Sequence, residues 1–470
     1  MPGARKNAVS FRRWGLALVR FLFCFALLPN LPFWLFAAHE GVAVPGWISL
    51  DGLLLGLAAL FLRPAWVIGA FAVDFLLDVM FAVRATFGTS YLDLLLSMRY
   101  WLSAIARARL IEALGLAFGS LALIAALWLL AAPRLRGRER AAVAFTILLI
   151  LVPWRLAARR ERAANDPGWA LASARSPALA FYHAWGPERL GAYIRGVPPP
   201  PLGPAQSAAS MALSQLHGRG FVLVLVESWG QAQDVALRQA LVAPFTSPQV
   251  LDRYGVRQGL VAFAGTTGPG ELRELCDRTL PPALPTALAL GSLGSCLGWT
   301  LRQRGYQTLA LDSAASFWPT GSGWYEQMGF QRVLGYPELR ALGVREFDAG
   351  PFRALADDGV AAQLPSLLAR VAKPNFVFFL TASAHLPIQL PPPDRYRADC
   401  QAFDTTRASA QACAWYRIES RTLESVAAAV VASAPAAVWL IVGDHAPPFL
   451  GRARQAFSQS AVPYLLLDPR

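Results

Sequence analysis

The sequence predicts an N-terminal bundle of transmembrane α-helices followed by a C-terminal α/β domain with a doubly wound, mostly parallel sheet. One reason is hydropathy: the 470-residue chain is 55% hydrophobic, and its apolar residues are concentrated in the first third. The other is that short apolar runs alternate with helical patterns from residue 220 onward, which is typical of a parallel sheet covered on both faces. We therefore expect a transmembrane domain of about five helices at residues 1–162, a linker at 163–219 and an extracytoplasmic α/β domain at 220–470.

The apolar runs of the first third are each near the length that a bilayer requires. They lie at about residues 14–38, 44–62, 65–83, 111–132 and 141–156. The basic N-terminus and the basic loop at 134–140 are expected on the cytoplasmic side, which places everything after residue 162 outside. The arginines between residues 155 and 162 oppose this topology, whereas the cysteine content favours it.

Four of the five cysteines lie in the α/β part, an even number that is compatible with two disulfides outside the cytoplasm. We expect the local pairs Cys276–Cys296 and Cys400–Cys413, although connectivity does not follow from sequence alone. The net charge of +13 indicates contact with anionic lipid headgroups. The sequence has no basic patch with interleaved aromatic residues, so nucleic acid is not an expected partner.

The expected strands of the α/β domain lie at residues 221–226, 259–264, 307–311, 376–380, 438–442 and 464–467. The expected helices between them include residues 234–242, 293–304, 361–371 and 415–432. Ligands and substrates of open α/β sheets bind just past the carboxyl ends of the strands. The residues that follow each apolar run are therefore the first candidates for a functional site.

Two of the expected strands end in metal-binding side chains. Asp444 and His445 directly follow the run at 438–442, and Glu227 follows the run at 221–226. A carboxylate and an imidazole at one sheet edge are suitable ligands for Zn²⁺ or Mn²⁺. The alternative is that Asp444 is a solvated turn residue and Glu227 a structural one. The convergence of two strand ends favours the metal site.

A glycine-rich segment after residues 259–264 carries two candidate nucleophiles, Thr266 and Thr267, just before Pro269. Proline suits the first turn of a helix, and a helix N-terminus binds phosphate through free N–H groups and the helix dipole. A hydroxyl at that position becomes a usable nucleophile when a metal ion stabilises its alkoxide. The alternative for either threonine is an ordinary N-cap.

Taken together, these residues resemble the alkaline phosphatase/sulfatase superfamily, and within it the membrane-anchored lipoteichoic acid synthases and phosphoethanolamine transferases. The resemblance implies an alkaline phosphatase-like α/β domain and one divalent metal, Zn or Mn with Mg as a further possibility. Its ligands would be Glu227, Thr267, Asp444 and His445. Thr267 is preferred to Thr266 as the nucleophile because its spacing to Glu271 fits the synthase pattern better.

The resemblance also assigns two substrate-binding residues. His385 follows the run at 376–380, where the family carries a histidine that contacts the substrate phosphate. Trp318 lies in the aromatic stretch at 317–325. The family often has an arginine near this stretch, and this chain has none there, so headgroup recognition is expected to differ. A true sulfatase is disfavoured because Cys276-Asp277-Arg278 does not fit the C-x-P-x-R motif.

The resemblance implies transfer of a phospholipid headgroup, phosphoethanolamine or phosphoglycerol, to an envelope glycan or lipid through a phospho-threonine. It places the chain in the bacterial inner membrane, with the catalytic domain on the periplasmic or extracytoplasmic side. The alternatives are a phosphoester hydrolase with water as the acceptor and a non-catalytic envelope-binding member. Donor, acceptor, metal and oligomeric state stay open at this point.

Overall fold

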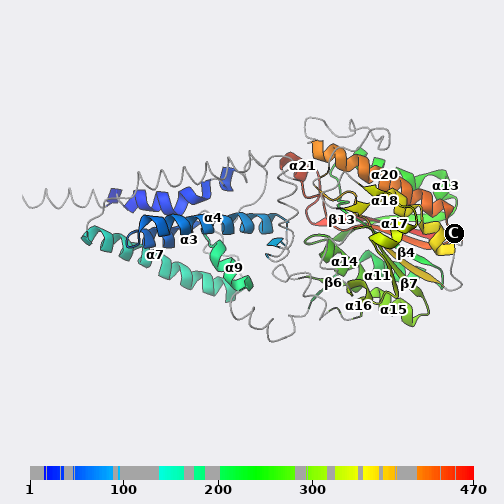
Figure 1. Cartoon of the computed structure of the whole chain (residues 1–470), viewed down its shortest axis with the longest axis horizontal. Helices are drawn as coiled ribbons and strands as arrows, with labels where there is room; N and C mark the ends of the chain where they lie inside the picture. The colour runs from blue at the N-terminus through cyan, green and yellow to red at the C-terminus, as the bar shows by residue number, and fades with distance from the viewer. Residues whose placement is uncertain are drawn as a thin grey trace, which may run out of the picture. The chain divides into compact units, whose positions relative to one another are not determined.

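The computed structural model describes residues 15–16, 18–31, 33–35, 46, 48–87, 91, 94–95, 137–163, 174–185, 202–280, 293, 295–314, 323–347, 353–369, 374–386, 388, 410–434, 436–449 and 451–470. The chain divides into two compact units (Figure 1). The first comprises Met1–Thr86 and Ile105–Gly191, and the second comprises Phe87–Ala104 and Ala192–Arg470.

The first unit is built from apolar helices. Its elements are η1 (Phe23–Leu27), η2 (Leu28–Asn30), β1 (Ile48–Ser49), α3 (Leu50–Ala59), α4 (Pro64–Phe87), α7 (Gly137–Ala163), β2 (Ala174–Arg175) and α9 (Pro177–Trp185). Phe25, Leu53, Val67 and Ile147 form part of its buried core. A polar link joins two of these elements, because Asp51 at the start of α3 accepts hydrogen bonds from Ser176 Oγ (2.5 Å) and Ala178 N (2.9 Å).

Among the described residues one helix is long and apolar enough to cross a bilayer, the part of α4 at Trp66–Arg84. It coincides with the predicted span at 65–83. The apolar helices at Leu50–Ala59 and Arg140–Trp154, which fall in the predicted spans at 44–62 and 141–156, are shorter. The predicted span at 111–132 lies outside the described residues. A bundle of five spans therefore remains a prediction.

The second unit is organised around a seven-stranded sheet with the order β5-β13-β12-β4-β11-β7-β8. The strands are β5 (Tyr254–Ala262), β13 (Ala461–Pro469), β12 (Val438–Gly443), β4 (Phe221–Val226), β11 (Asn375–Leu380), β7 (Gln307–Asp312) and β8 (Arg332–Leu334). The five strands from β12 to β8 are parallel to one another, and β13 is antiparallel to both β12 and β5. The predicted α/β fold is confirmed as a mixed sheet.

Some strand predictions need correction. The strand predicted at 259–264 is β5, which starts at Tyr254 and ends at Ala262. β5 is an edge strand whose middle residues Arg257 and Gln258 are polar and exposed, so a search for apolar runs finds only its end. The last predicted strand extends over Ala461–Pro469 and runs antiparallel to its neighbours. The three-residue β8 at the other edge was not predicted.

Helices cover both faces of the sheet. The side chains of each strand point alternately to the two faces and so contribute to two separate hydrophobic cores. In β4, Val224 and Val226 belong to one core and Leu223 and Leu225 to the other. The first core includes α12 (Val235–Val242), α18 (Asp357–Ala361), α19 (Leu364–Ala369) and α20 (Ala410–Ala432), and the second includes α11 (Ala208–Ala212), α14 (Thr267–Cys276) and α15 (Leu297–Gln303). Figure 1 shows α18 and α20 on one side of the sheet and α11, α14 and α15 on the other.

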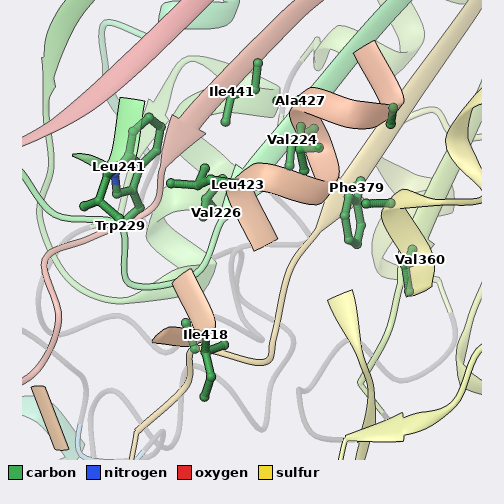
Figure 2. Packing of buried hydrophobic residues seen from close by; sticks show 14 of the residues in the cluster. Val224, Val226, Trp229, Leu241, Val360, Phe379, Ile418, Leu423, Ala427 and Ile441 are labelled. Carbon is green, nitrogen blue, oxygen red and sulfur yellow. The ribbon is translucent and has the colours of Figure 1, made fainter. Parts of the chain in front are cut away.

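Figure 2 shows the first core from close by, with Leu423 of α20 beside Val226 of β4. The remaining short elements of this unit are β3 (Gly203–Pro204), η3 (Leu213–Gln215), η4 (Ala243–Thr246), α13 (Pro248–Leu251), β6 (Arg278–Thr279), α16 (Trp324–Gln327), α17 (Tyr336–Ala341), β9 (Glu346–Phe347), β10 (Ala354–Leu355) and α21 (Gly451–Gln455). The predicted disulfide Cys276–Cys296 is formed and links the end of α14 to the start of α15. Cys413 is disulfide-bonded, whereas its predicted partner Cys400 lies outside the described residues.

Candidate metal centre and active site

The strand register brings the two predicted metal-binding segments together. Gly443 at the end of β12 pairs with Val226 at the end of β4, so Asp444 and Glu227 leave the sheet side by side. Ligand atoms of Glu227, Asp444 and His445 all lie within 4.8 Å of one another, and all three residues are buried. Segments about 200 residues apart in the sequence therefore meet at one point, as carboxyl ends of parallel strands do.

Thr267 joins this group from the start of α14. Its Oγ1 donates a hydrogen bond to Glu227 Oε2 at 2.8 Å and lies 3.4 Å from His445 Nε2. The side chain is buried, with 1% of its surface exposed. Thr266 is the N-cap residue of α14, is half-buried and makes no side-chain capping hydrogen bond. Of the two threonines, the structure therefore brings Thr267 to the metal-binding side chains.

The Asp444 carboxylate is held so that one oxygen stays available. Oδ1 accepts hydrogen bonds from Ser228 N at 2.7 Å and from His445 N at 2.6 Å. Oδ2 has no hydrogen-bond partner in the described part of the chain, although it is buried. Ser228, whose N–H makes the first of these bonds, adopts a left-handed conformation with φ of 62°. Backbone strain at a non-glycine residue is most often found at functional sites.

The imidazole of His445 faces the carboxylates of Asp444 and Glu227. Its Nδ1 lies 2.8 Å from the carbonyl oxygen of Ala446. Because a carbonyl oxygen can only accept a hydrogen bond, a ring proton is assigned to Nδ1. Nε2 faces Asp444 Oδ2 at 3.4 Å and Glu227 Oε1 at 3.5 Å. A lone pair on Nε2 would be repelled by these oxygens unless a positive charge lies between them, either a proton on Nε2 or a bound metal ion. Two carboxylates, an imidazole and a hydroxyl fit a divalent ion such as Zn²⁺, Mn²⁺ or Mg²⁺.

The protonation equilibria of the group follow from its burial and its charges. Burial, together with the neighbouring charge of Glu227, raises the pKa of Asp444 to about 7. Burial alone would raise the pKa of Glu227, but the charges of His445 and His385 bring that pKa below its ordinary value. Burial alone would lower the pKa of His445, but the carboxylates of Asp444 and Glu227 raise this pKa above its ordinary value. A proton on the His445 ring therefore offsets part of their charge, and a divalent cation could take the place of that proton.

His385 lies at the same edge of the sheet, in the segment that follows β11. Burial lowers the pKa of His385. The negative charge of Glu227 acts on this pKa in the opposite direction. Nδ1 lies 2.8 Å from the carbonyl oxygen of Leu386, which assigns the proton of the neutral ring to Nδ1. Thr381, at the start of this segment, accepts a hydrogen bond from Glu227 N at 2.8 Å. Trp318 lies outside the described residues.

Several polar residues near the site were not predicted from the sequence. Arg273 of α14 donates to the backbone beside Asp444. Glu271, one turn after Thr267, accepts a hydrogen bond from Tyr325 Oη at 2.7 Å. Glu419 of α20 is fully buried, and neither of its carboxylate oxygens has a partner in the described ranges. Of these residues, only Glu271 could have been found from the sequence, because its spacing of four residues puts it on the same helical face as Thr267.

No family profile and no curated protein matches the sequence of this chain. Solved structures do resemble it. The lipoteichoic acid synthase LtaP from Listeria monocytogenes has a TM-score of 0.40 and 10% identity, over 54% of this chain and 66% of LtaP. The chain thus spans just under two thirds of the LtaP structure.

Two further structures carry related names. The C-terminal periplasmic domain of EcEptC from Escherichia coli, solved in complex with Zn, has a TM-score of 0.36 and 14% identity, over 58% of this chain and 77% of that domain. The phosphoglycerol transferase GacH from Streptococcus pyogenes, in complex with sn-glycerol-1-phosphate, has a TM-score of 0.36 and 13% identity, over 55% of this chain and 71% of GacH. The α/β unit resembles these proteins in fold.

Proposed function

We propose that this chain is a membrane-bound, metal-dependent transferase of phospholipid headgroups. It would move phosphoethanolamine or phosphoglycerol from a membrane phospholipid to an envelope glycan or lipid through a phospho-threonine at residue 267. The observation that carries the proposal is the placement of Thr267 Oγ1, 2.8 Å from Glu227 Oε2 and 3.4 Å from His445 Nε2, at a helix N-terminus. A buried hydroxyl between metal-binding side chains is arranged as a nucleophile rather than as an N-cap.

The metal would be held by Glu227, Thr267, Asp444 and His445. When bound, a divalent ion supplies positive charge that lowers the pKa of a hydroxyl and offsets the charge of a phosphate. Glu227 Oε2 already accepts the hydroxyl proton of Thr267 in a hydrogen bond, so it orients Oγ1 for attack. The first-turn N–H groups of α14 and the helix dipole favour a phosphate at that position.

The first half-reaction forms a bond between Thr267 Oγ1 and phosphorus and breaks the bond between phosphorus and the glycerol oxygen of the lipid. The Thr267 hydroxyl gives its proton to Glu227, and diacylglycerol leaves as its glycerol oxygen takes up a proton, for which the protonated form of His385 is the candidate donor. In the second half-reaction an acceptor hydroxyl attacks phosphorus and gives its proton to His385, and the Thr267 oxygen leaves and regains its proton from Glu227. Trp318 and His385 are the proposed contacts to the headgroup phosphate and its surroundings.

The membrane arrangement belongs to the proposal as well. A chain whose donor is a membrane phospholipid needs its site at a bilayer surface, and the apolar helix at Trp66–Arg84 is a suitable anchor. Residues 1–162 would be the membrane domain, 163–219 the linker and 220–470 the catalytic domain outside the cytoplasm of a bacterial inner membrane. The Cys276–Cys296 disulfide supports an oxidising compartment.

Substitution of the nucleophile tests the proposal. Thr267→Ala removes the oxygen that forms the covalent bond and costs at most one hydrogen bond, about 1 kcal/mol of stability, so turnover should be lost while the fold persists. Thr267→Ser keeps a hydroxyl and should retain part of the turnover. The measurement is release of diacylglycerol from labelled phosphatidylethanolamine and phosphatidylglycerol, with circular dichroism as the folding control.

Thr266→Ala is the matched control, because this neighbouring hydroxyl has no assigned role in bond making. If Thr266→Ala is inactive and Thr267→Ala retains full turnover, the nucleophile is assigned one residue too late. If both variants stay active, the covalent mechanism is wrong. The fate of the label separates transfer from hydrolysis: a transferase moves it to the added acceptor, whereas a hydrolase releases it as the free headgroup phosphate.

A further inference from the structure

Arg273 is a buried arginine whose side chain is committed to three hydrogen bonds. Nη1 donates to the carbonyl oxygen of Asp444 at 3.0 Å and Nη2 donates to that of Gly443 at 2.6 Å. Nε donates to Glu274 Oε1 at 2.6 Å. Only 4% of its surface is exposed. The guanidinium is therefore placed against the backbone of the segment that carries two of the candidate metal ligands.

These contacts join the two halves of the site. Arg273 lies on α14, the helix that starts at Thr267, and Asp444 follows β12. The helix also approaches this segment closely at Gly270, where an added Cβ would lie 2.8 Å from Asp444 Cβ. The distance between the nucleophile and Asp444 is thus set by direct packing of α14 on the end of β12.

An arginine suits this position because its planar fork can donate to two neighbouring carbonyl oxygens at once, whereas lysine is a point donor. Burial of its charge requires a partner. Glu274 supplies one, and its other oxygen accepts a hydrogen bond from Ala209 N at 3.0 Å at the start of α11. The guanidinium is consequently held between the carbonyl oxygens of Gly443 and Asp444 and the Glu274 carboxylate. In turn, α11 fixes that carboxylate through Ala209 N.

We propose that Arg273 is a positioning residue of the metal centre: it holds the Gly443–Asp444 peptide so that Asp444 and Thr267 face the same ion. The inference rests on the proposed metal centre and goes beyond it, because Arg273 touches neither the ion nor the substrate. Removal of a group that orients a metal ligand without touching the metal typically lowers metal affinity or activity by about 10–100-fold. A purely structural arginine would change stability alone.

The chain offers a matched control in Arg253. This arginine also donates to two backbone carbonyl oxygens, those of Val431 and Ser433, the second at 2.9 Å. Val431 lies near the end of α20 and Ser433 just after it, and neither residue belongs to the candidate site. Arg253→Lys and Arg273→Lys therefore disrupt the same kind of contact, once away from the site and once beside it.

The experiment compares the full-length wild type with Arg273→Lys and Arg253→Lys. Dissociation constants for Zn²⁺ and Mn²⁺ are measured by competition with a chelator, and thermal midpoints are measured on the metal-free proteins. Arg273→Lys should weaken metal binding by about 10-fold or more. Arg253→Lys should leave the dissociation constants unchanged, although both substitutions lower the metal-free midpoint. Wild-type metal affinity in folded Arg273→Lys would overturn the proposal.

A milder variant covers the case in which Arg273→Lys does not fold. Glu274→Gln removes the charge-assisted hydrogen bond to Nε but keeps the guanidinium, and it should weaken metal binding by about threefold or more, since such bonds are roughly twice as strong as neutral ones. Unchanged affinity in this variant would then overturn the role of Arg273. A wild type that binds no divalent ion would instead contradict the metal centre itself, together with this role.

Discussion

Two sets of buried carboxyl groups lie near the same edge of the sheet and differ in how their oxygens are satisfied. Asp357 accepts hydrogen bonds from Ala382 N at 3.0 and 3.1 Å and from Ser383 N at 2.7 Å, and Glu271 accepts one from Tyr325 Oη. Asp444 Oδ2, by contrast, has no partner among the described residues and faces other metal-binding atoms.

Burial does not separate the two sets. It raises the pKa of Asp357 and of Asp444 alike to about 7. What distinguishes Asp444 is an oxygen that the protein leaves unsatisfied, beside a hydroxyl and an imidazole. A perturbed pKa thus marks a buried acid, and the hydrogen-bond pattern shows whether the acid is structural or available to a ligand.

The largest expected difference between the two sets is in metal content. Asp444→Ala removes a proposed ligand and should abolish binding of the divalent ion that we propose for the wild type. Asp357→Asn should keep the wild-type metal content, because Asp357 bonds to the backbone of the segment after β11. Its new amide group would meet N–H donors there, so the thermal midpoint should fall. Elemental analysis of the purified proteins measures the metal content.

Two outcomes would break this comparison. Equal metal content in wild type and Asp444→Ala would remove Asp444 from the site. Loss of the ion in folded Asp357→Asn would show that the second set also serves the metal. Circular dichroism of both variants separates loss of a ligand from loss of the fold.

A smaller effect is expected from Glu271. Burial raises its pKa from 4.5 to about 8, so the folded protein keeps a proton that the unfolded chain releases. The stability associated with this group is fully present below pH 4.5 and is lost as the pH rises to about 8. Glu271→Gln does not titrate and can still accept the Tyr325 hydrogen bond. The midpoint of the metal-free variant should therefore fall less over this pH range than that of the wild type.

Thermal unfolding of metal-free wild type and Glu271→Gln across this pH range checks the sign. If the thermal midpoints of the two proteins change with pH in the same way, Glu271 is ionised in the folded protein. That result would place it with the available carboxylates rather than with the structural ones.

The sequence was informative wherever a short apolar run ended in a polar residue. The runs of β4 and β12 predicted both strands, and the parallel register then brought Glu227 and Asp444 together. The threonine pair was also visible, because glycine and proline mark a helix start, and the contacts of Thr267 separate it from Thr266. These features are local, so a pattern of neighbouring residues encodes them.

Features that depend on tertiary contacts could not be predicted in this way. The direction of β13 follows from how the chain returns to the sheet after β12, and its composition does not reveal this. Arg273 looks like any helical arginine, yet its partners are backbone carbonyls 170 and 171 residues away in the sequence. The burial of Glu419 likewise depends on which face of α20 packs on the sheet.

Mass spectrometry of the acid-quenched protein shows whether Thr267 is the covalent nucleophile. The wild type is incubated with phosphatidylethanolamine or phosphatidylglycerol in the absence of an acceptor, and the peptide that contains residue 267 is analysed. The account predicts a phosphoethanolamine or phosphoglycerol adduct on Thr267 whose mass identifies the donor, and no adduct in Thr267→Ala. An adduct on Thr266, or wild-type turnover by Thr267→Ala without any adduct, would contradict it.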